Sequence, residues 1–126
     1  MQETITLKIT MNELKTILLN HYKKAFKDEN IKLTYKTTEV GDYYKEVKIF
    51  IFRETKVGNF SGEIKYELND KEVLEVVNEE LEKSGYQTKK LNYIIMFDSV
   101  SEIKFDVIKT NNKQKSIGGI KWNFKN

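Results

Sequence analysis

Few residues in this chain of 126 could do acid, base or metal chemistry. His21 is the single histidine, and the sequence contains no cysteine. A cysteine nucleophile is therefore excluded, as is a zinc site built from thiolates or several imidazoles. A serine nucleophile has no support either, because no Gly-x-Ser-x-Gly turn occurs and His21 falls on the apolar stripe of an expected helix. We expect His21 to lie at the boundary between core and solvent.

Paired carboxylates are the remaining route to catalysis, since two acids can hydrolyse a glycosidic bond or hold Mg²⁺. Glu13 and Glu72, however, are placed to cap helices, and Asp98 stands in an expected turn. Gly118 and Gly119 follow a loop with two lysines but precede an expected strand, so they lack the helix dipole that strengthens phosphate binding. The sequence therefore predicts no enzyme, and it indicates no cofactor and no metal.

The elements that position these residues include two helices. Each is expected to begin with a capping box, in which a side chain and a glutamate three residues later satisfy free backbone N–H groups: Thr10 with Glu13, and Asn69 with Glu72. Apolar residues then recur at helical spacing in both stretches. We expect the first helix to end near residues 28–30, and Gly85 to supply the left-handed residue that closes the second.

Alternation of apolar and polar residues predicts strands at 5–9, 31–36, 47–51, 64–68, 91–97, 103–107 and 120–124. Turns are expected around Gly41 and Asp42, around Gly58 and Asn59, and at residues 98–99. Because short connections favour antiparallel neighbours, the order β-α-β-β-β-α-β-β-β predicts an α+β fold. Two helices would pack on a largely antiparallel sheet of about seven strands, or on two half-sheets related by a pseudo-twofold axis.

The sequence also predicts an internally duplicated β-α-β-β-β unit. An offset of 59 residues places the first strand, cap and helix stripe on residues 64–77, and an offset of 56 matches residues 46–49 with 102–105. We expect a single domain, 1–126, with pseudo-repeats roughly at 1–61 and 62–116 and a closing C-terminal strand at 117–126. Chance similarity between two stretches of one secondary-structure pattern is the alternative.

This duplicated element order resembles one domain of a sliding clamp and, more loosely, glyoxalase-like modules. The resemblance is to the order of elements and carries no functional residue to this chain. Glyoxalase-type metal chemistry would require His and Glu ligands on strands, whereas His21 lies on an expected helix.

Charge and composition narrow the classes of partner that the chain could bind. The net charge is +3, and all but one of the 22 basic residues are lysines, which are poorly suited to bidentate reading of bases. Residues 101–126 carry six lysines against two acids, so low-specificity contact with nucleic acid is an alternative. No signal-like or membrane-spanning apolar segment occurs, and with no cysteine this favours a cytoplasmic location without a membrane partner.

Apolar residues on the polar face of the sheet are the main functional indication. If alternate residues of each strand face the helices, including Leu91, Tyr93, Ile95 and Phe97, the other face receives Phe50, Phe52, Ile94, Met96 and Ile108. These side chains need a cover: a partner protein, a homodimer seam, or an internal layer if the sheet curls. Tyr43 and Tyr44, in an expected hairpin loop, are a second candidate contact.

The sequence therefore predicts a non-enzymatic protein-binding module, an adaptor or an occluding inhibitor, that acts through a sheet face or a loop. Its partner would be another protein or a second copy of the chain. The abundance of Lys, Asn and Ile and the lack of Pro suit an AT-rich genome, such as that of a phage or mobile element. The alternative is a Lys-rich nucleic-acid-binding protein of low specificity.

Overall fold

The computed structural model describes residues 3–110 of the chain. The elements follow in the order β1 (Ile5–Ile9), α1 (Met11–Phe26), β2 (Lys32–Val40), β3 (Tyr44–Val57), β4 (Phe60–Leu68), α2 (Asp70–Glu82), β5 (Tyr86–Thr88), β6 (Asn92–Met96) and β7 (Ser99–Lys109). All strand pairs are antiparallel. The predicted α+β fold on antiparallel strands is confirmed.

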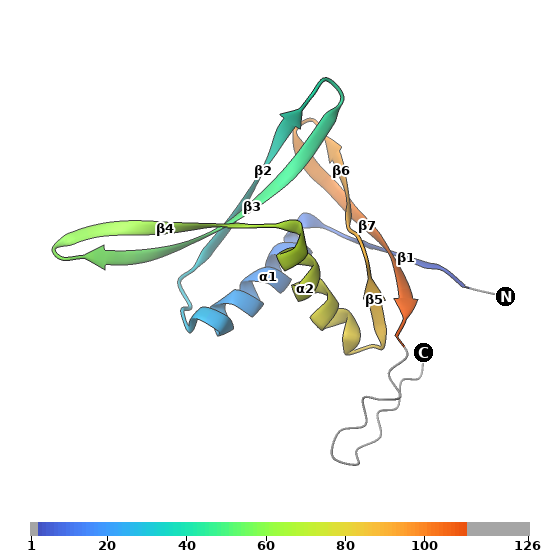
Figure 1. Ribbon diagram of the computed structural model, residues 1–126, viewed down its shortest axis with the longest axis horizontal. Helices are drawn as coiled ribbons and strands as arrows, with labels where there is room; N and C mark the ends of the chain where they lie inside the picture. The colour runs from blue at the N-terminus through green and yellow to red at the C-terminus, as the bar shows by residue number, and fades with distance from the viewer. Residues whose placement is uncertain (1–2, 111–126) are drawn as a thin grey trace, which may run out of the picture.

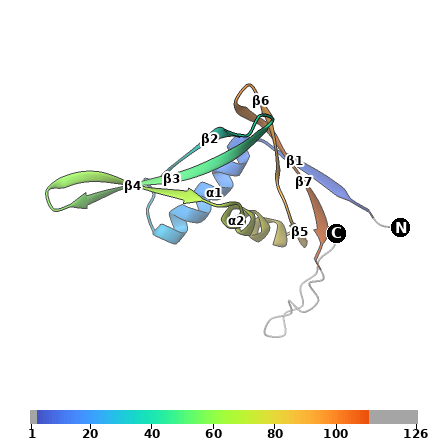
Figure 2. The same cartoon turned by 45° about the horizontal axis from the view of Figure 1, so that its top comes forward.

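The strands divide between two sheets. One has the order β2-β3-β4. In the other, β7 is central: Ile103 pairs with Ile9 of β1 and with Tyr93 of β6, so these strands occupy opposite edges of β7. β5 pairs with the end of β7 on the same side as β6. The sheets converge where the β2–β3 and β6–β7 hairpins turn and diverge below, and both helices lie in the angle between them (Figures 1 and 2).

The core fills this angle. The helices contribute their apolar stripes and each sheet its helix-facing residues, as the spacing predicted. Among the fully buried side chains are Leu14, Leu18, Ile51, Ile103 and Val73. Burying both sheets' inner faces against two helices thus accounts for the alternation seen along the strands.

Both predicted capping boxes are present. The Glu13 N–H donates to Thr10 Oγ1 at 3.1 Å and the Glu72 N–H donates to Asn69 Oδ1 at 2.8 Å, while each glutamate accepts from the backbone of its cap residue. The first helix ends earlier than expected, at Phe26, because Lys27 adopts a left-handed conformation with φ of 53°.

A polar side-chain contact joins the two helices. His21 Nδ1 of α1 lies 3.0 Å from Glu79 Oε2 of α2, and the His21 side chain is one-third exposed, 32%. Its predicted place between core and solvent is confirmed. Within residues 3–110, neither helix is long and apolar enough to cross a membrane.

The two sheets share a pairing plan, since β1 pairs with β7 as β4 pairs with β3. Ile9 is opposite Ile103 and Leu68 is opposite Ile49. If Ile9 corresponds to Leu68, at the offset of 59 residues, then Ile49 corresponds to Ile103 at an offset of 54, where the sequence comparison used 56. The internal duplication stays a prediction. The expected strand at 120–124 lies outside the described residues.

Short β5 was not predicted, and it owes its position to tertiary contacts. The Thr88 N–H donates to Asn78 Oδ1 of α2 at 2.8 Å, and Thr88 Oγ1 donates to the Asp106 carbonyl of β7 at 2.8 Å. The strand therefore links the second helix to the central strand of its sheet.

Candidate protein-interaction surfaces

Phe50 lies on the outer face of the three-stranded sheet but is not exposed. Its neighbours Ile49 and Ile51 belong to the core cluster and Phe50 does not, which confirms that it points away from the helices. Lys36 and Lys65, however, hold their Nζ atoms 5.5 and 4.2 Å from its ring centroid, and only 5% of the residue is exposed. The aliphatic stems of two lysines from neighbouring strands thus supply the cover that the sequence required.

Phe52, two residues along the same strand, is half-buried in the same way. It pairs with Lys32 on β2 and Lys65 on β4, and the Lys65 Nζ atom lies 6.0 Å from its ring centroid. The two phenylalanines therefore belong to a lysine-covered outer layer of this sheet. They do not form an open apolar patch.

Ile94, Met96 and Ile108 lie on the outer face of the other sheet and are exposed. Ile94 pairs with Glu102, whereas Ile108 pairs with Gln87 near the far end of β7. Six residues of extended strand separate these two positions, about 20 Å. The five sheet-face residues predicted from the sequence are thus distributed over two sheets, and the structure does not bring them together.

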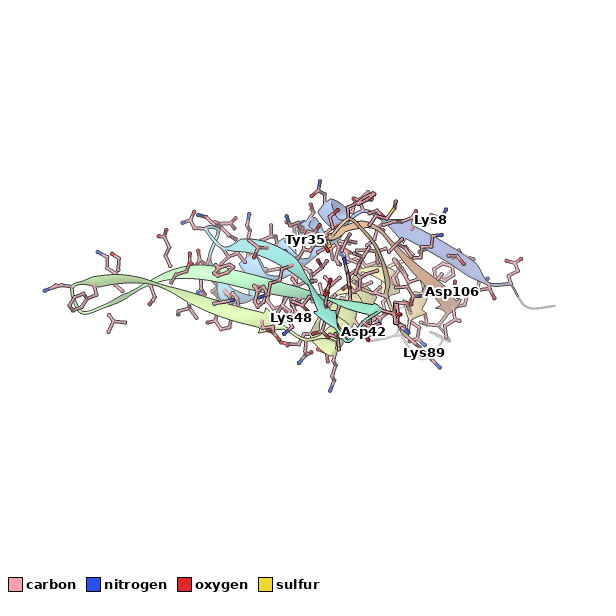
Figure 3. All side chains as sticks on the ribbon, turned by 90° about the horizontal axis from the view of Figure 1, so that it is seen from above. Lys8, Tyr35, Asp42, Lys48, Lys89 and Asp106 are labelled. Carbon is pink, nitrogen blue, oxygen red and sulfur yellow. The ribbon has the colours of Figure 1, made fainter. Side chains whose placement is uncertain are left out.

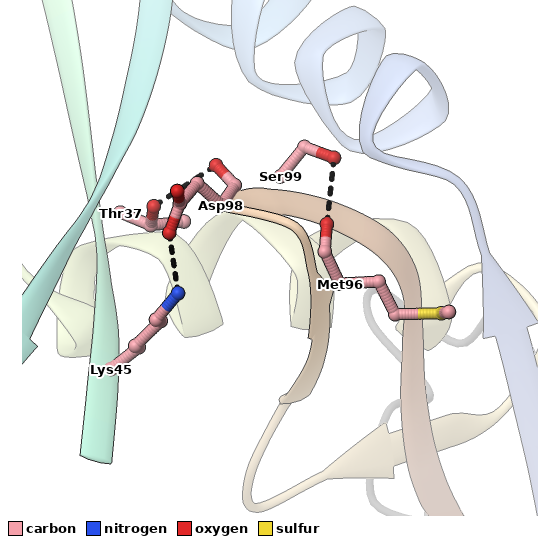
Figure 4. Close-up of polar contacts among 5 residues, drawn as sticks. All are labelled: Thr37, Lys45, Met96, Asp98 and Ser99. Carbon is pink, nitrogen blue, oxygen red and sulfur yellow. Dashed lines mark hydrogen bonds and ion pairs between the residues drawn. The ribbon is translucent and has the colours of Figure 1, made fainter. Parts of the chain in front are cut away.

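The β2–β3 turn presents Tyr43 and Tyr44, as predicted. Tyr43 is fully exposed and Tyr44 is exposed over most of its surface. Asp42, in this turn, is labelled in the view from above (Figure 3). The β6–β7 turn contacts the strands that flank the β2–β3 turn, at Thr37 of β2 and Lys45 of β3. Asp98 joins the two hairpins. Its carboxylate accepts a hydrogen bond from Lys45 Nζ, and its backbone carbonyl accepts one from Thr37 Oγ1 at 3.0 Å (Figure 4).

Phe97 was expected to point into the core and does not. Met96 pairs with Ser99, so the turn consists of Phe97 and Asp98, one residue earlier than predicted. Both have positive φ, 52° and 64°, the pattern of a type I′ hairpin turn. A side chain in the turn cannot follow the pleat of the strand, and Phe97 is 96% exposed.

Large apolar or aromatic side chains are exposed in or next to these two turns. We call this surface the apex patch; its residues are Val40, Tyr43, Tyr44, Met96 and Phe97. Three of them were named from the sequence. Phe97 and Val40 were missed, because their exposure depends on where the strands stop pairing.

A second exposed apolar site, also missed, is the tip of the β3–β4 hairpin. This hairpin projects from the body as an arm (Figure 1), and its tip carries the exposed side chains of Val57 and Phe60. Its base is held by Arg53, whose guanidinium carbon lies 4.9 Å from the Phe26 ring centroid and whose Nε lies 3.7 Å from Asp28 Oδ2. The turn around Gly58 and Asn59 was itself predicted.

Between the sheets, beside the first turn of α2, runs a groove of about 520 Å³. We call it the inter-sheet groove. One wall is residues 44–48 of β3, the other is residues 90–93 leading into β6, and Leu68, Asp70 and Leu74 are also in the lining. Burial, with a smaller effect of the Asp70 charge, raises the pKa of the Tyr93 hydroxyl in this groove to about 12.

Within residues 3–110, no three His, Asp or Glu side chains are grouped so that they could hold a metal ion. No protein-family model, no curated protein and no solved structure matches the chain.

Proposed function

We propose that this chain is a cytoplasmic, non-enzymatic protein-binding module and that the apex patch is its contact surface. The observation that carries the proposal is Phe97: a bulky aromatic residue in a left-handed conformation with almost its whole side chain in solvent. Such a conformation is a genuine outlier for a bulky residue, and strain of this kind clusters at binding sites.

The energetics of the turn support this interpretation. A left-handed conformation costs a residue with a Cβ atom about 1–2 kcal/mol. An exposed ring recovers almost nothing by burial within the chain, since Phe97 is 96% exposed. Asn or Gly would satisfy the same turn without this cost. Phe97 therefore detracts from folding, and burial against a partner would recover the apolar contribution of its ring.

Neighbouring side chains suit the same role. Tyr43 and Tyr44 add rigid aromatic area with polar tips, which is typical of residues that dominate binding energy. The hydrogen bonds that Asp98 accepts from Thr37 and Lys45 hold the two hairpins together before any partner arrives. A preorganised surface of this kind loses less conformational freedom on binding. Such a surface suits an adaptor, or an inhibitor that occludes its partner. We propose that a phage or mobile element encodes the chain.

The test is a comparison of tagged variants in lysate of the source cells. We expect a protein that co-purifies with the unchanged chain to be lost with Tyr43→Ser combined with Phe97→Asn. It should be retained with Ile108→Ser, the matched control, which removes an exposed apolar side chain from the same sheet but outside the apex patch. Equal recovery with all three chains would contradict the proposal. Light scattering of the same variants tests whether the partner at the apex patch is a second copy of the chain: if so, a dimer formed by the unchanged chain should dissociate only in the double variant.

The alternative, a nucleic-acid binder of low specificity, is favoured by the lysines on the outer face of the three-stranded sheet. Lys32, Lys36 and Lys65 surround Phe50 and Phe52 there. The ring of Phe50 is covered, however, so it offers no stacking platform to a base. Titration of labelled single- and double-stranded DNA at two salt concentrations tests nucleic-acid binding. Binding through phosphate contacts should weaken steeply as salt rises. Absence of binding at low salt rejects the alternative.

A further inference from the structure

The β3–β4 arm, residues 53–64, is a two-stranded ribbon with one apolar and one polar face. Residues paired across the strands share a face, and the pairs Thr55 with Gly62 and Val57 with Phe60 continue the face that buries Ile51 in the core. The opposite face carries only polar residues, namely Glu54, Lys56, Ser61 and Glu63. An amphipathic ribbon therefore projects from the body of the protein (Figure 1).

Within the described part of the chain, the apolar face of the arm lies open to solvent. Beyond Phe52, β3 pairs with β4 alone among residues 3–110. Val57 and Phe60 are 72% and 78% exposed, and Ile64, nearer the body, is 37% exposed. A two-stranded hairpin by itself is marginally stable in water. A second surface packed on this face would therefore stabilise the arm.

Gly62, in the middle of β4, indicates that another chain approaches this face closely. It does not have a positive φ, and the two strands pair through it without a bulge. Apart from the adjoining residues, a Cβ atom at this position would meet only Thr55 Cγ2, at 3.7 Å, which is an ordinary van der Waals contact. The arm itself therefore does not require glycine, which weakens the interior of a strand. Glycine in such a position often marks a site where another backbone or a ligand comes close.

We propose that the apolar face of the arm is a self-association surface, on which a second copy of the chain packs its own arm. Val57 and Phe60 form a large pair, and Thr55 and Gly62 form a small pair about 7 Å away along the ribbon. In a twofold contact, residue i of one copy meets residue j of the other, and j meets i. Two arms stacked face to face in opposite directions thus place the large pair of each copy on the small pair of the other.

Charge favours a second arm over a highly charged partner. Residues 53–64 hold two basic and two acidic side chains, so two arms have no net charge to repel one another. The apolar face carries one of these charges, Arg53, which lies beside Asp28 and the Phe26 ring of its own chain. A nucleic acid or an anionic membrane would meet no excess of positive charge on the arm.

The area that two arms can bury predicts a weak dimer. Each arm offers one exposed aromatic ring and two partly or largely exposed aliphatic side chains, and an aromatic side chain buries roughly 150–250 Å². The total stays below the about 1,200 Å² at which stable interfaces begin. The dimer should therefore form reversibly and at high protein concentration. Because the arm is separate from the apex patch, this proposal and the proposed function can fail independently.

Sedimentation velocity over micromolar to millimolar protein concentrations tests the dimer. We expect the sedimentation coefficient of the unchanged chain to rise with concentration. The rise should be lost in Phe60→Ser, which removes the large ring, and in Gly62→Gln, which fills the small pair. Ser61→Gln is the matched control, because it adds the same side chain to the opposite face of the same strand, and it should dimerise like the unchanged chain. Tyr43→Ser combined with Phe97→Asn, which changes only the apex patch, should also dimerise.

Three results would overturn the proposal. The first is a monomer at every concentration, and the second is a dimer that survives Phe60→Ser. The third is a dimer lost equally in Ser61→Gln or in the apex variant, which would assign the contact to another surface. Circular dichroism confirms that each variant is folded, as expected for changes outside the core cluster.

Discussion

Lys45 of β3 and Asp98 of the β6–β7 turn form an ion pair that ties the two sheets together at their apex. The hydrogen bond from the ammonium to the Asp98 carboxylate raises the pKa of Lys45. The residues are 53 positions apart in sequence, and each lies in or beside a turn that carries exposed aromatic residues. Through this pair, two hairpins from different sheets contact each other.

Removing the charge of this pair should loosen the apex and leave the fold intact. We expect Lys45→Met to lower the thermal midpoint slightly at low salt, because Asp98 is 78% exposed and exposed pairs contribute little. The difference from the unchanged protein should disappear in concentrated salt, which screens exposed charges. Asp98→Asn, which tolerates positive φ, should behave in the same way. A large loss of stability that persists at high salt would contradict this account.

Relieving the strain at Phe97 should stabilise the protein. Asn tolerates the left-handed conformation far better than Phe, so Phe97→Asn should increase the free energy of unfolding by about 1 kcal/mol. For a domain of this size, the thermal midpoint should rise by roughly 4 °C. Thermal unfolding followed by circular dichroism measures it. If the variant is instead less stable, Phe97 contributes to folding and the argument from its strain fails.

Phe50, by contrast, should contribute to the stability of the fold. Phe50→Ala removes a buried ring from beneath two lysine stems, and the free energy of unfolding should fall by about 3 kcal/mol. Phe52→Ala, the matched change at a half-buried position, should cost less than half as much. Urea denaturation of both variants checks the order. Equal and small losses would show that the lysines do not exclude water from the Phe50 ring.

Tyr93 should make stability depend on pH in the alkaline range. Its pKa rises from 10.0 to about 12 on folding, so between these values the unfolded chain has released a proton that the folded chain retains. Stability is unaffected below pH 10 and falls as pH rises toward 12. Tyr93→Phe should be less sensitive across that window, measured by urea denaturation at a series of pH values. An unchanged slope in the variant would place the titrating group elsewhere.

Local signals predicted most of the elements. The capping boxes at Thr10 and Asn69 and the turns near Gly41 and Gly58 depend on residues a few positions apart, and the structure confirms them. β5 was missed because three residues are too few to show a period, and its place depends on Asn78 of α2. Local patterns could not place a strand that tertiary hydrogen bonds create.

The candidate surfaces show the same contrast between what local patterns predict and what tertiary contacts create. The sequence determined that Phe50, Ile94 and Met96 point away from the helices, because pleating alternates side chains whatever the sheet does next. Only the tertiary structure decided which of them reach solvent. Lys36 and Lys65 cover Phe50 from neighbouring strands, and strand register moved Phe97 from the core into a turn. Exposure depends on which strands become neighbours, and that is settled by long-range packing, which no local pattern encodes.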